Sequence, residues 1–223
     1  MRREVVLDTE TTGLNPATGD RIVEIGCVEL VNHVATGEFF HQYVNPQRPM
    51  PDEAFRVHGL SDEFLSLQPA MSDVMADLIE FIGDAPLIIH NADFDMRFIN
   101  AELNLLGQTQ LQMARAVDTV RLAREKFPGA PASLDALCKR FGIDNSSRSL
   151  HGALLDAQLL AEVYLELIGG RQRDFELAAD REAAPVAARD AERREPRPHA
   201  PSEEELAAHK AFVEKLKNPI WLS

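Results

Sequence analysis

The sequence has few of the features that mark secreted or membrane proteins. Its 223 residues include only two cysteines, and no apolar run approaches the roughly 18 residues that a transmembrane helix needs. No signal peptide is apparent before the first strand pattern. Cys27 and Cys138 lie in apolar periodic segments, so we expect buried free thiols rather than a disulfide scaffold. These absences indicate a cytoplasmic protein.

Cationic side chains are scarce in the first 170 residues. This part of the chain has 13 Lys and Arg against 25 Asp and Glu, a net charge of −12 out of a total of −13. Because cationic side chains drive contact with phosphate groups, this part is a poor nonspecific binder of nucleic acid. If the protein acts on nucleic acid, metal ions must offset the repulsion, or another protein must hold it there.

Three strand patterns open the chain, and helices and strands alternate after them. The strands are expected at 3–10, 22–31 and 39–44, as an antiparallel meander with a hairpin tip at Asn32-His33. Short helical pieces follow within 49–69, then a helix at 72–82, a buried strand at 86–90, and helices at 94–106, 118–126, 133–141 and 152–167. Ser72 and Ser133 are the expected N-caps. The pattern predicts an α/β domain with a mixed sheet flanked by helices over residues 1–170. No GxGxxG follows the first strand, so a dinucleotide-binding fold has no support.

The composition changes after residue 170. Ala, Arg, Glu, Asp and Pro dominate 171–201 without a hydrophobic period, which predicts a disordered linker. Ser202 and Glu205 then form a capping-box pattern that opens a short C-terminal helix. The segment 202–223 carries apolar residues that either fold back on the domain or dock on a partner: Leu206, Phe212, Val213, Leu216 and Trp221.

Two carboxylates end the first strand at Asp8 and Glu10. Successive side chains on a strand alternate, so this i, i+2 spacing puts both on one face. Two neighbouring acids repel each other, and a shared Mg²⁺ or Mn²⁺ would relieve that repulsion. The alternative is a strand that ends in solvated acids.

Three further residues could belong to the same site. Asp95 lies where a helix begins just after the buried strand, a position where an acid is often a cap. Asp156 lies in an apolar-rich helix, where an acid is unfavourable unless it is paired, binds metal or faces solvent. His151 precedes that helix and is either a surface residue or a general base for water.

The ordered motifs resemble those of the DEDD 3′–5′ exonucleases over residues 3–170. They are Asp8-Thr9-Glu10-Thr11-Thr12-Gly13, His90-Asn91-Ala92-x-Phe94-Asp95 and His151-x4-Asp156. The histidine five residues before the last aspartate marks the histidine branch (DEDDh), and the nearest likeness is to its DnaQ-like proofreading members. The resemblance implies a ribonuclease H-like fold.

The resemblance also implies roles for individual residues. Two divalent cations, Mg²⁺ or Mn²⁺, are held by Asp8, Glu10, Asp95 and Asp156. His151 is the general base for the water that releases the 3′-terminal nucleotide as a 5′-monophosphate. The terminal nucleotide is contacted by Asp8, Thr9, Glu10, Glu53, His58 and Asp156, with the turn Thr11-Thr12-Gly13 and Leu14 near its base. Apart from these roles, His90 is expected to be a structural hydrogen-bonding residue, and Asp118, at an Asp-Thr helix start, is expected either to cap that helix or to support the site from behind the ligands.

The implied partners are a single-stranded or frayed DNA 3′ end and, through the tail, the catalytic (alpha) subunit of a bacterial replicative polymerase, polymerase III. Tail contacts are expected from Leu206, Phe212, Val213, Leu216 and Trp221. The sliding clamp and a small theta-like subunit are further candidates, and the place of action is the bacterial cytoplasm. One alternative is an RNA 3′-end-processing exonuclease of the same branch. Another is a non-catalytic adaptor, which predicts a lost motif acid, whereas all are present.

Overall fold

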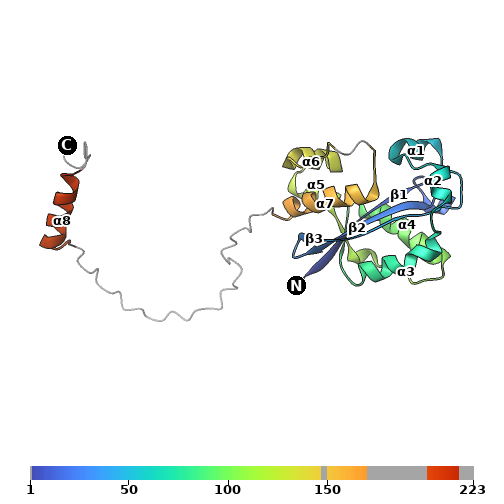
Figure 1. The fold of residues 1–223 in the computed structure, drawn as a ribbon, viewed down its shortest axis with the longest axis horizontal. Coiled ribbons are helices and arrows are strands. Elements are labelled where there is room, and N and C mark those ends of the chain that lie inside the picture. The colour runs from blue at the N-terminus through green and yellow to red at the C-terminus, as the bar shows by residue number, and fades with distance from the viewer. Residues whose placement is uncertain (1, 147–149, 170–199, 216–223) are drawn as a thin grey trace. The chain divides into compact units, whose positions relative to one another are not determined.

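The computed structural model describes residues 2–146, 150–169 and 200–215. They fall in two compact units, residues 1–175 and 176–223. The first unit contains a five-stranded sheet in the order β3-β2-β1-β4-β5 (Figure 1). Its strands are β1 (Arg3–Thr11), β2 (Ile22–Val31), β3 (Val34–Tyr43), β4 (Leu87–Ile89) and β5 (Ala116–Asp118). β1, β2 and β3 pair antiparallel, whereas β1, β4 and β5 pair parallel. The predicted mixed sheet is confirmed.

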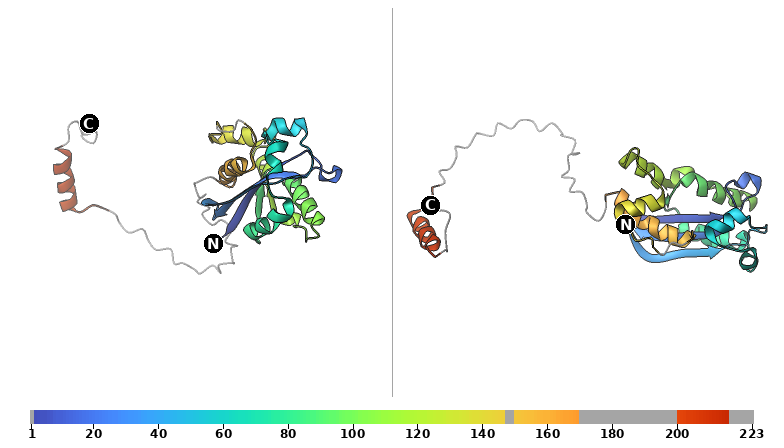
Figure 2. Two further views of the ribbon diagram at one scale, coloured as in Figure 1. Left: turned by 45° about the vertical axis from the view of Figure 1, so that its right-hand side comes forward. Right: turned by 90° about the horizontal axis from the view of Figure 1, so that it is seen from above.

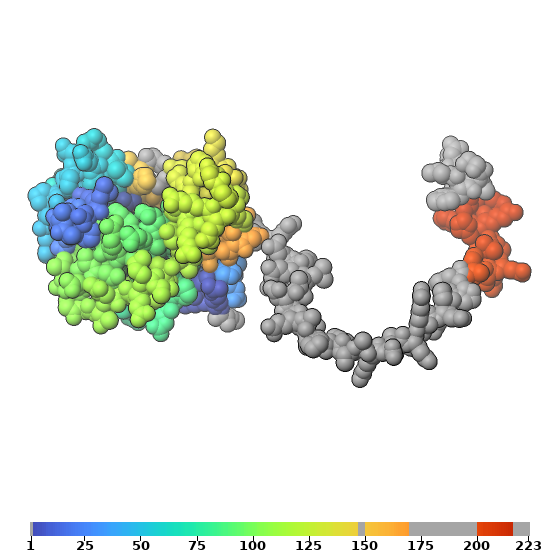
Figure 3. All heavy atoms as spheres, turned by 180° about the vertical axis from the view of Figure 1, so that it is seen from behind, coloured from blue at the N-terminus to red at the C-terminus, as the bar shows by residue number. Residues whose placement is uncertain are grey.

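Helices cover both faces of this sheet (Figure 2). They are α1 (Asp52–His58), α2 (Asp62–Ser66), α3 (Met71–Ile82), α4 (Ala92–Leu105), α5 (Thr119–Lys126), α6 (Leu134–Phe141) and α7 (Ala153–Leu167), with short 3-10 turns η1 (Pro16–Thr18) and η2 (Met113–Arg115). One apolar cluster joins the sheet to α3 and α4, and a second joins it to α5, α6 and α7. In Figure 3 the green to yellow-green residues of α4 to α6 make up much of the visible surface of this unit.

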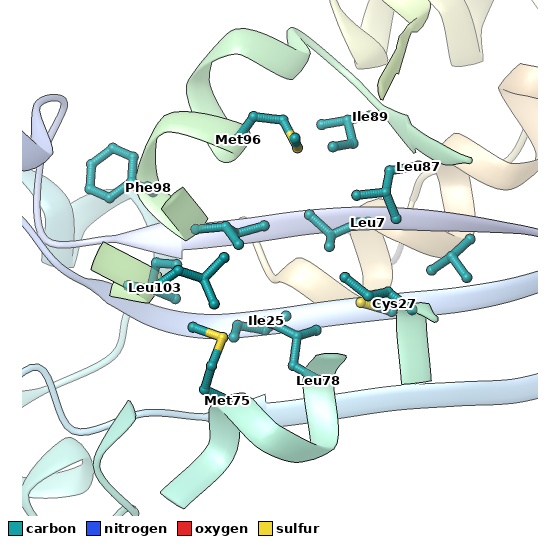
Figure 4. Close-up of a cluster of buried hydrophobic side chains, with 14 of the residues drawn as sticks. Leu7, Ile25, Cys27, Met75, Leu78, Leu87, Ile89, Met96, Phe98 and Leu103 are labelled. Carbon is teal, nitrogen blue, oxygen red and sulfur yellow. The ribbon is translucent and has the colours of Figure 1, made fainter. Parts of the chain in front are cut away.

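The central strand β1 serves both clusters because its side chains alternate. Val5 and Leu7 enter the cluster with α3 and α4, shown in Figure 4, whereas Val6 enters the other. All three are fully buried. Asp8 and Glu10 continue the Val6 side of the strand, which is the side that α7 covers.

Several element boundaries differ from the sequence expectation. β3 begins at Val34 rather than 39, because it pairs with β2 from the hairpin tip, where Asn32 and His33 both have positive φ. α4 begins at Ala92 rather than 94. The expectation that Ser72 caps α3 is wrong: the helix begins at Met71, and its N-cap Ala70 makes no side-chain bond.

The second unit contains helix α8 (Glu203–Val213). Ser202 and Glu205 form the expected capping box. Leu206 and Phe212 are exposed, whereas Val213 is buried. Most of the predicted linker, together with Leu216 and Trp221, lies outside the described residues and stays a prediction. Across the described ranges, no helix is both long and apolar enough to cross a bilayer.

Candidate active site

The end of β1 faces a glycine on the neighbouring strand. Asp8 is paired with Gly26 of β2. A Cβ atom on Gly26 would lie 2.3 Å from backbone atoms of Ala153 and Leu154 in the first turn of α7. The missing side chain therefore lets α7 rest directly on the strand beside Asp8. Gly26 was not among the residues predicted to shape the site, although an isolated glycine inside a strand often marks a close backbone approach.

α7 thereby brings its own acid and the preceding histidine to the end of β1. Ligating atoms of Glu10, His151 and Asp156 all lie within 4.8 Å of one another. Glu10 and Asp156 are 8% and 3% exposed, and Nδ1 of His151 is 3.4 Å from Oδ2 of Asp156. Within the part of the chain that the structure describes, this is the one grouping of acid, histidine or cysteine side chains that could hold a metal ion.

Asp95 lies in the first turn of α4 and is 3% exposed. The Thr9 hydroxyl donates a 2.6 Å hydrogen bond to its Oδ1. Burial raises the pKa of Asp95 to about 7, because this effect outweighs the lowering by the Thr9 hydroxyl and nearby backbone groups. A buried carboxyl that is costly to ionise has the chemistry of a divalent-cation ligand, since carboxylate oxygens suit Mg²⁺ and Mn²⁺, although Asp95 is not in the grouping of Glu10, His151 and Asp156. The hydrogen bond from Thr9 to Asp95 is a contact that the strand pattern in the sequence could not reveal.

The turn that precedes Asp95 is held by hydrogen bonds to the neighbouring strand-to-helix turn. Asn91 has a φ of 67°, and its N–H donates to Oδ1 of Asp118 over 3.1 Å. The same oxygen caps α5 by accepting from the N–H of Val120. Nδ1 of His90 lies 2.9 Å from the Thr119 hydroxyl. His90 thus makes the kind of structural contact expected of it, and Asp118 takes the capping role, one of the two left open for it.

The turn after β1 packs against the side chain of Asp20. Its carboxylate lies where a Cβ on Gly13 would be and accepts from the N–H of Asn15. Arg48 forms an ion pair with the same carboxylate at 2.8 Å. Leu14, which follows Gly13 in this turn, is left 79% exposed.

Helix α1 carries the two other predicted nucleotide contacts, and they differ in environment. His58 ends the helix and is 6% exposed. Burial lowers its pKa, with a smaller contribution of the same sign from His151, while a hydrogen bond to the Thr11 backbone opposes both. Glu53 is exposed in the first turn of α1, and none of the described contacts joins it to the acids.

Comparison with known proteins identifies the family. Residues 5–164 match the family model described as Exonuclease. The chain is 51% identical over 222 residues to DNA polymerase III subunit epsilon of Rickettsia conorii (strain ATCC VR-613 / Malish 7), covering 96% of each chain. It is 49% identical over 176 residues to the Escherichia coli (strain K12) protein of the same name, covering 76% of this chain and 72% of that one.

Solved structures share the fold. Exonuclease X in complex with 5′ overhanging duplex DNA aligns with a TM-score of 0.59 and 26% identity, over 75% of this chain and 91% of that chain. The nuclease domain of 3′hExo, a DEDDh family member bound to rAMP, aligns with a TM-score of 0.64 and 20% identity, over 77% of this chain and 94% of that one. The predicted ribonuclease H-like fold and the predicted enzyme class, a nuclease of the DnaQ type, are confirmed. The chain belongs to the exonuclease family.

Proposed function

We propose that this protein is the proofreading 3′–5′ exonuclease of a bacterial replicative DNA polymerase, acting in the cytoplasm as subunit epsilon of polymerase III. The observation that carries the proposal is the convergence of Glu10, His151 and Asp156, which come from opposite ends of the exonuclease domain. The names of relatives about 50% identical over almost the whole chain support a DNA substrate and a polymerase III assembly.

Four carboxylates would hold the cations: Asp8, Glu10, Asp95 and Asp156. Bound Mg²⁺ or Mn²⁺ would supply charge stabilisation to the phosphodiester oxygens during displacement. The acids themselves orient the site, because Glu10, Asp95 and Asp156 are buried and come from three different elements. Asp8, which is paired with Gly26 beside the first turn of α7, would be one of these ligands.

His151 is the proposed general base. Its ring is about half exposed, with a side-chain exposure of 48%, so water and a DNA end can reach it. A neutral imidazole takes the proton of the attacking water. The Asp156 carboxylate on the Nδ1 side then stabilises the imidazolium that forms. The terminal nucleotide would lie between the His151 imidazole and His58 on α1. The hydrogen bond from the Thr9 hydroxyl would hold Asp95 in place.

This site has no need to read base sequence. A mismatched 3′ end is less costly to unpair than a matched one, so frayed ends reach the acids more often. Repulsion between DNA and a domain of net charge −12 would make unassisted binding weak. A tether to the polymerase would replace affinity by effective concentration.

The tether in this proposal is the segment 202–223, which binds the alpha subunit. Leu206 and Phe212 are 54% and 61% exposed on α8, and exposed apolar residues of this kind are typical anchors for a partner surface. Deleting residues 201–223 should abolish co-elution with the polymerase subunit and leave exonuclease activity intact. As a control, replacing the exposed Glu203 and Glu204 with glutamine should leave co-elution intact. Unchanged co-elution after the deletion would rule out this role.

The catalytic proposal is tested by Asp8→Ala combined with Glu10→Ala. The double variant should release no mononucleotide from single-stranded DNA with Mg²⁺ or Mn²⁺, yet still co-elute with the polymerase. The control removes two exposed carboxylates from α3, by Asp73→Ala with Asp77→Ala, and should keep full activity. Parallel reactions on RNA of the same sequence separate DNA proofreading from RNA 3′-end processing.

A further inference from the structure

The segment that carries His151 lies against the end of helix α1, more than ninety residues earlier in the chain. The N–H of His151 donates a 3.1 Å hydrogen bond to the carbonyl of Val57. The side chain of Leu150 lies over Gly59, where an added Cβ would be 2.7 Å from its Cδ1. Both residues of the segment therefore contact the same turn.

His151 needs support from outside α7. The helix begins at Ala153, with Gly152 as an N-cap that makes no side-chain bond. The backbone of His151 thus lies before the helical hydrogen-bond ladder. Asp156, by contrast, is inside the helix and buried. Helix α7 therefore fixes the backbone of Asp156 but not that of His151, whose ring reaches the helix through its 3.4 Å contact with Asp156.

Gly59 meets two requirements at this contact. It ends α1 with a φ of 74°, and its N–H donates to the carbonyl of Phe55 over 2.7 Å. It also leaves the space that Leu150 fills. A Cβ at this position would come within 4 Å of Leu150 alone, apart from its chain neighbours. The absence of a side chain at Gly59 is therefore matched to the position of Leu150.

We propose that the Val57 carbonyl, Gly59 and Leu150 form a latch that positions His151 over the site. Because His58 lies within the same turn, the latch places the general base at a fixed position relative to the helix that contacts the terminal nucleotide. The inference rests on the proposed function, since it takes His151 as the base and α1 as the nucleotide contact. Leu150 and Gly59 are positioning residues and touch no reacting atom.

The first test is Leu150→Ala in the full-length chain. Leu150 is 49% exposed, so its truncation should leave the melting temperature almost unchanged. The turnover number on single-stranded DNA should fall about tenfold, which is part of the 10²–10⁴-fold that a general base contributes. The KM for DNA and the affinity for Mn²⁺ should stay within twofold. Leu150→Met, which keeps an apolar side chain of similar size, should restore most of the rate. Leu105→Ala, at a 65% exposed leucine of α4, is the matched control and should match wild type.

The second test combines Leu150→Ala with His151→Ala. If the latch acts through His151, truncating Leu150 should have no further effect once the imidazole is gone. Gly59→Ala should also slow turnover, because its new Cβ would clash with Leu150. Adding Leu150→Ala to Gly59→Ala removes this clash, so the second substitution should slow turnover less than Leu150→Ala does in the wild-type chain.

The outcomes separate the latch from the proposed function. A His151→Ala variant with wild-type turnover would contradict the general-base role and the latch together. A slow His151→Ala variant with a Leu150→Ala turnover within twofold of wild type would overturn the latch alone. Equal losses from Leu150→Ala with and without His151 would overturn it as well.

Discussion

Replacing Gly26 with alanine would put one methyl group between β2 and the first turn of α7. The new Cβ would lie 2.3 Å from the backbone of Ala153 and Leu154, whereas ordinary contacts begin at 3.4 Å. The obstacle is backbone, so no side-chain rotation relieves it. The helix must move by about 1 Å, carrying Asp156 away from β1.

The size of the effect follows from that displacement. A misplacement of about 1 Å at a catalytic constellation can reduce the rate about 10²-fold. Overpacking of this kind typically costs about 1–3 kcal/mol in the free energy of unfolding. We therefore expect Gly26→Ala to fold, to unfold at lower urea concentration, and to hydrolyse DNA about a hundredfold more slowly, with weaker Mn²⁺ binding.

Val28→Ala is the matched control for Gly26→Ala. Val28 is on the same strand and the same face, and it is buried in the cluster beneath α7. Its truncation should destabilise the chain to a similar degree, about 1–3 kcal/mol, without moving the first turn of α7. Turnover should be measured by release of the 3′-terminal nucleotide from labelled single-stranded DNA, with unfolding followed by circular dichroism. The reasoning fails if Gly26→Ala keeps activity within threefold of wild type, or if both variants lose activity equally.

Two further predictions concern stability. Without metal, stability should fall as the pH rises from about 4 to about 7, because the raised pKa keeps Asp95 protonated in the folded chain while the unfolded chain has lost that proton. Asp95→Asn should remove this part of the slope and raise the free energy of unfolding at pH 7.5 in EDTA by more than about 1 kcal/mol; urea titrations that give the same slope for both proteins would contradict this. Arg21→Ala should destabilise the chain by about 3–5 kcal/mol, because Arg21 pairs with the buried Glu102 at 2.6 Å. Removing Arg121 from its solvent-exposed pair on α5 should leave the stability almost unchanged, and equal thermal shifts for the two variants would refute the distinction.

The parts of the fold that the sequence could predict are those with a strong local signal. The apolar runs in 3–10 and 22–31 and the turn at Asn32-His33 identify the meander, and Ser133 and Ser202 identify two helix starts. The first five residues of β3 were missed because they are exposed and lack an apolar alternation. The prediction that Ser72 is the N-cap of α3 was wrong because the N-cap is the residue whose backbone leaves the extended conformation for the first helical turn. That residue is Ala70.

The acids of the site were predicted from motif order, but the contacts that position them were not. Thr9 beside Asp95, Gly26 beneath α7 and Gly59 beneath Leu150 all join segments separated by at least 85 positions. Such contacts depend on strand register and on the packing of helices against the sheet, which no local pattern encodes. Of these residues, only Gly26 has a signal in the sequence, because a glycine inside a strand often marks a close backbone approach.

The most direct test of the central claim is the product of a DNA degradation assay. Single-stranded DNA labelled at its 3′ end should release the terminal nucleotide as a 5′-monophosphate when Mg²⁺ or Mn²⁺ is present. EDTA should stop the reaction, and so should Asp8→Ala combined with Glu10→Ala. If the wild-type chain releases no mononucleotide with either metal, or if the double variant is as active as wild type, the proposed exonuclease site is wrong.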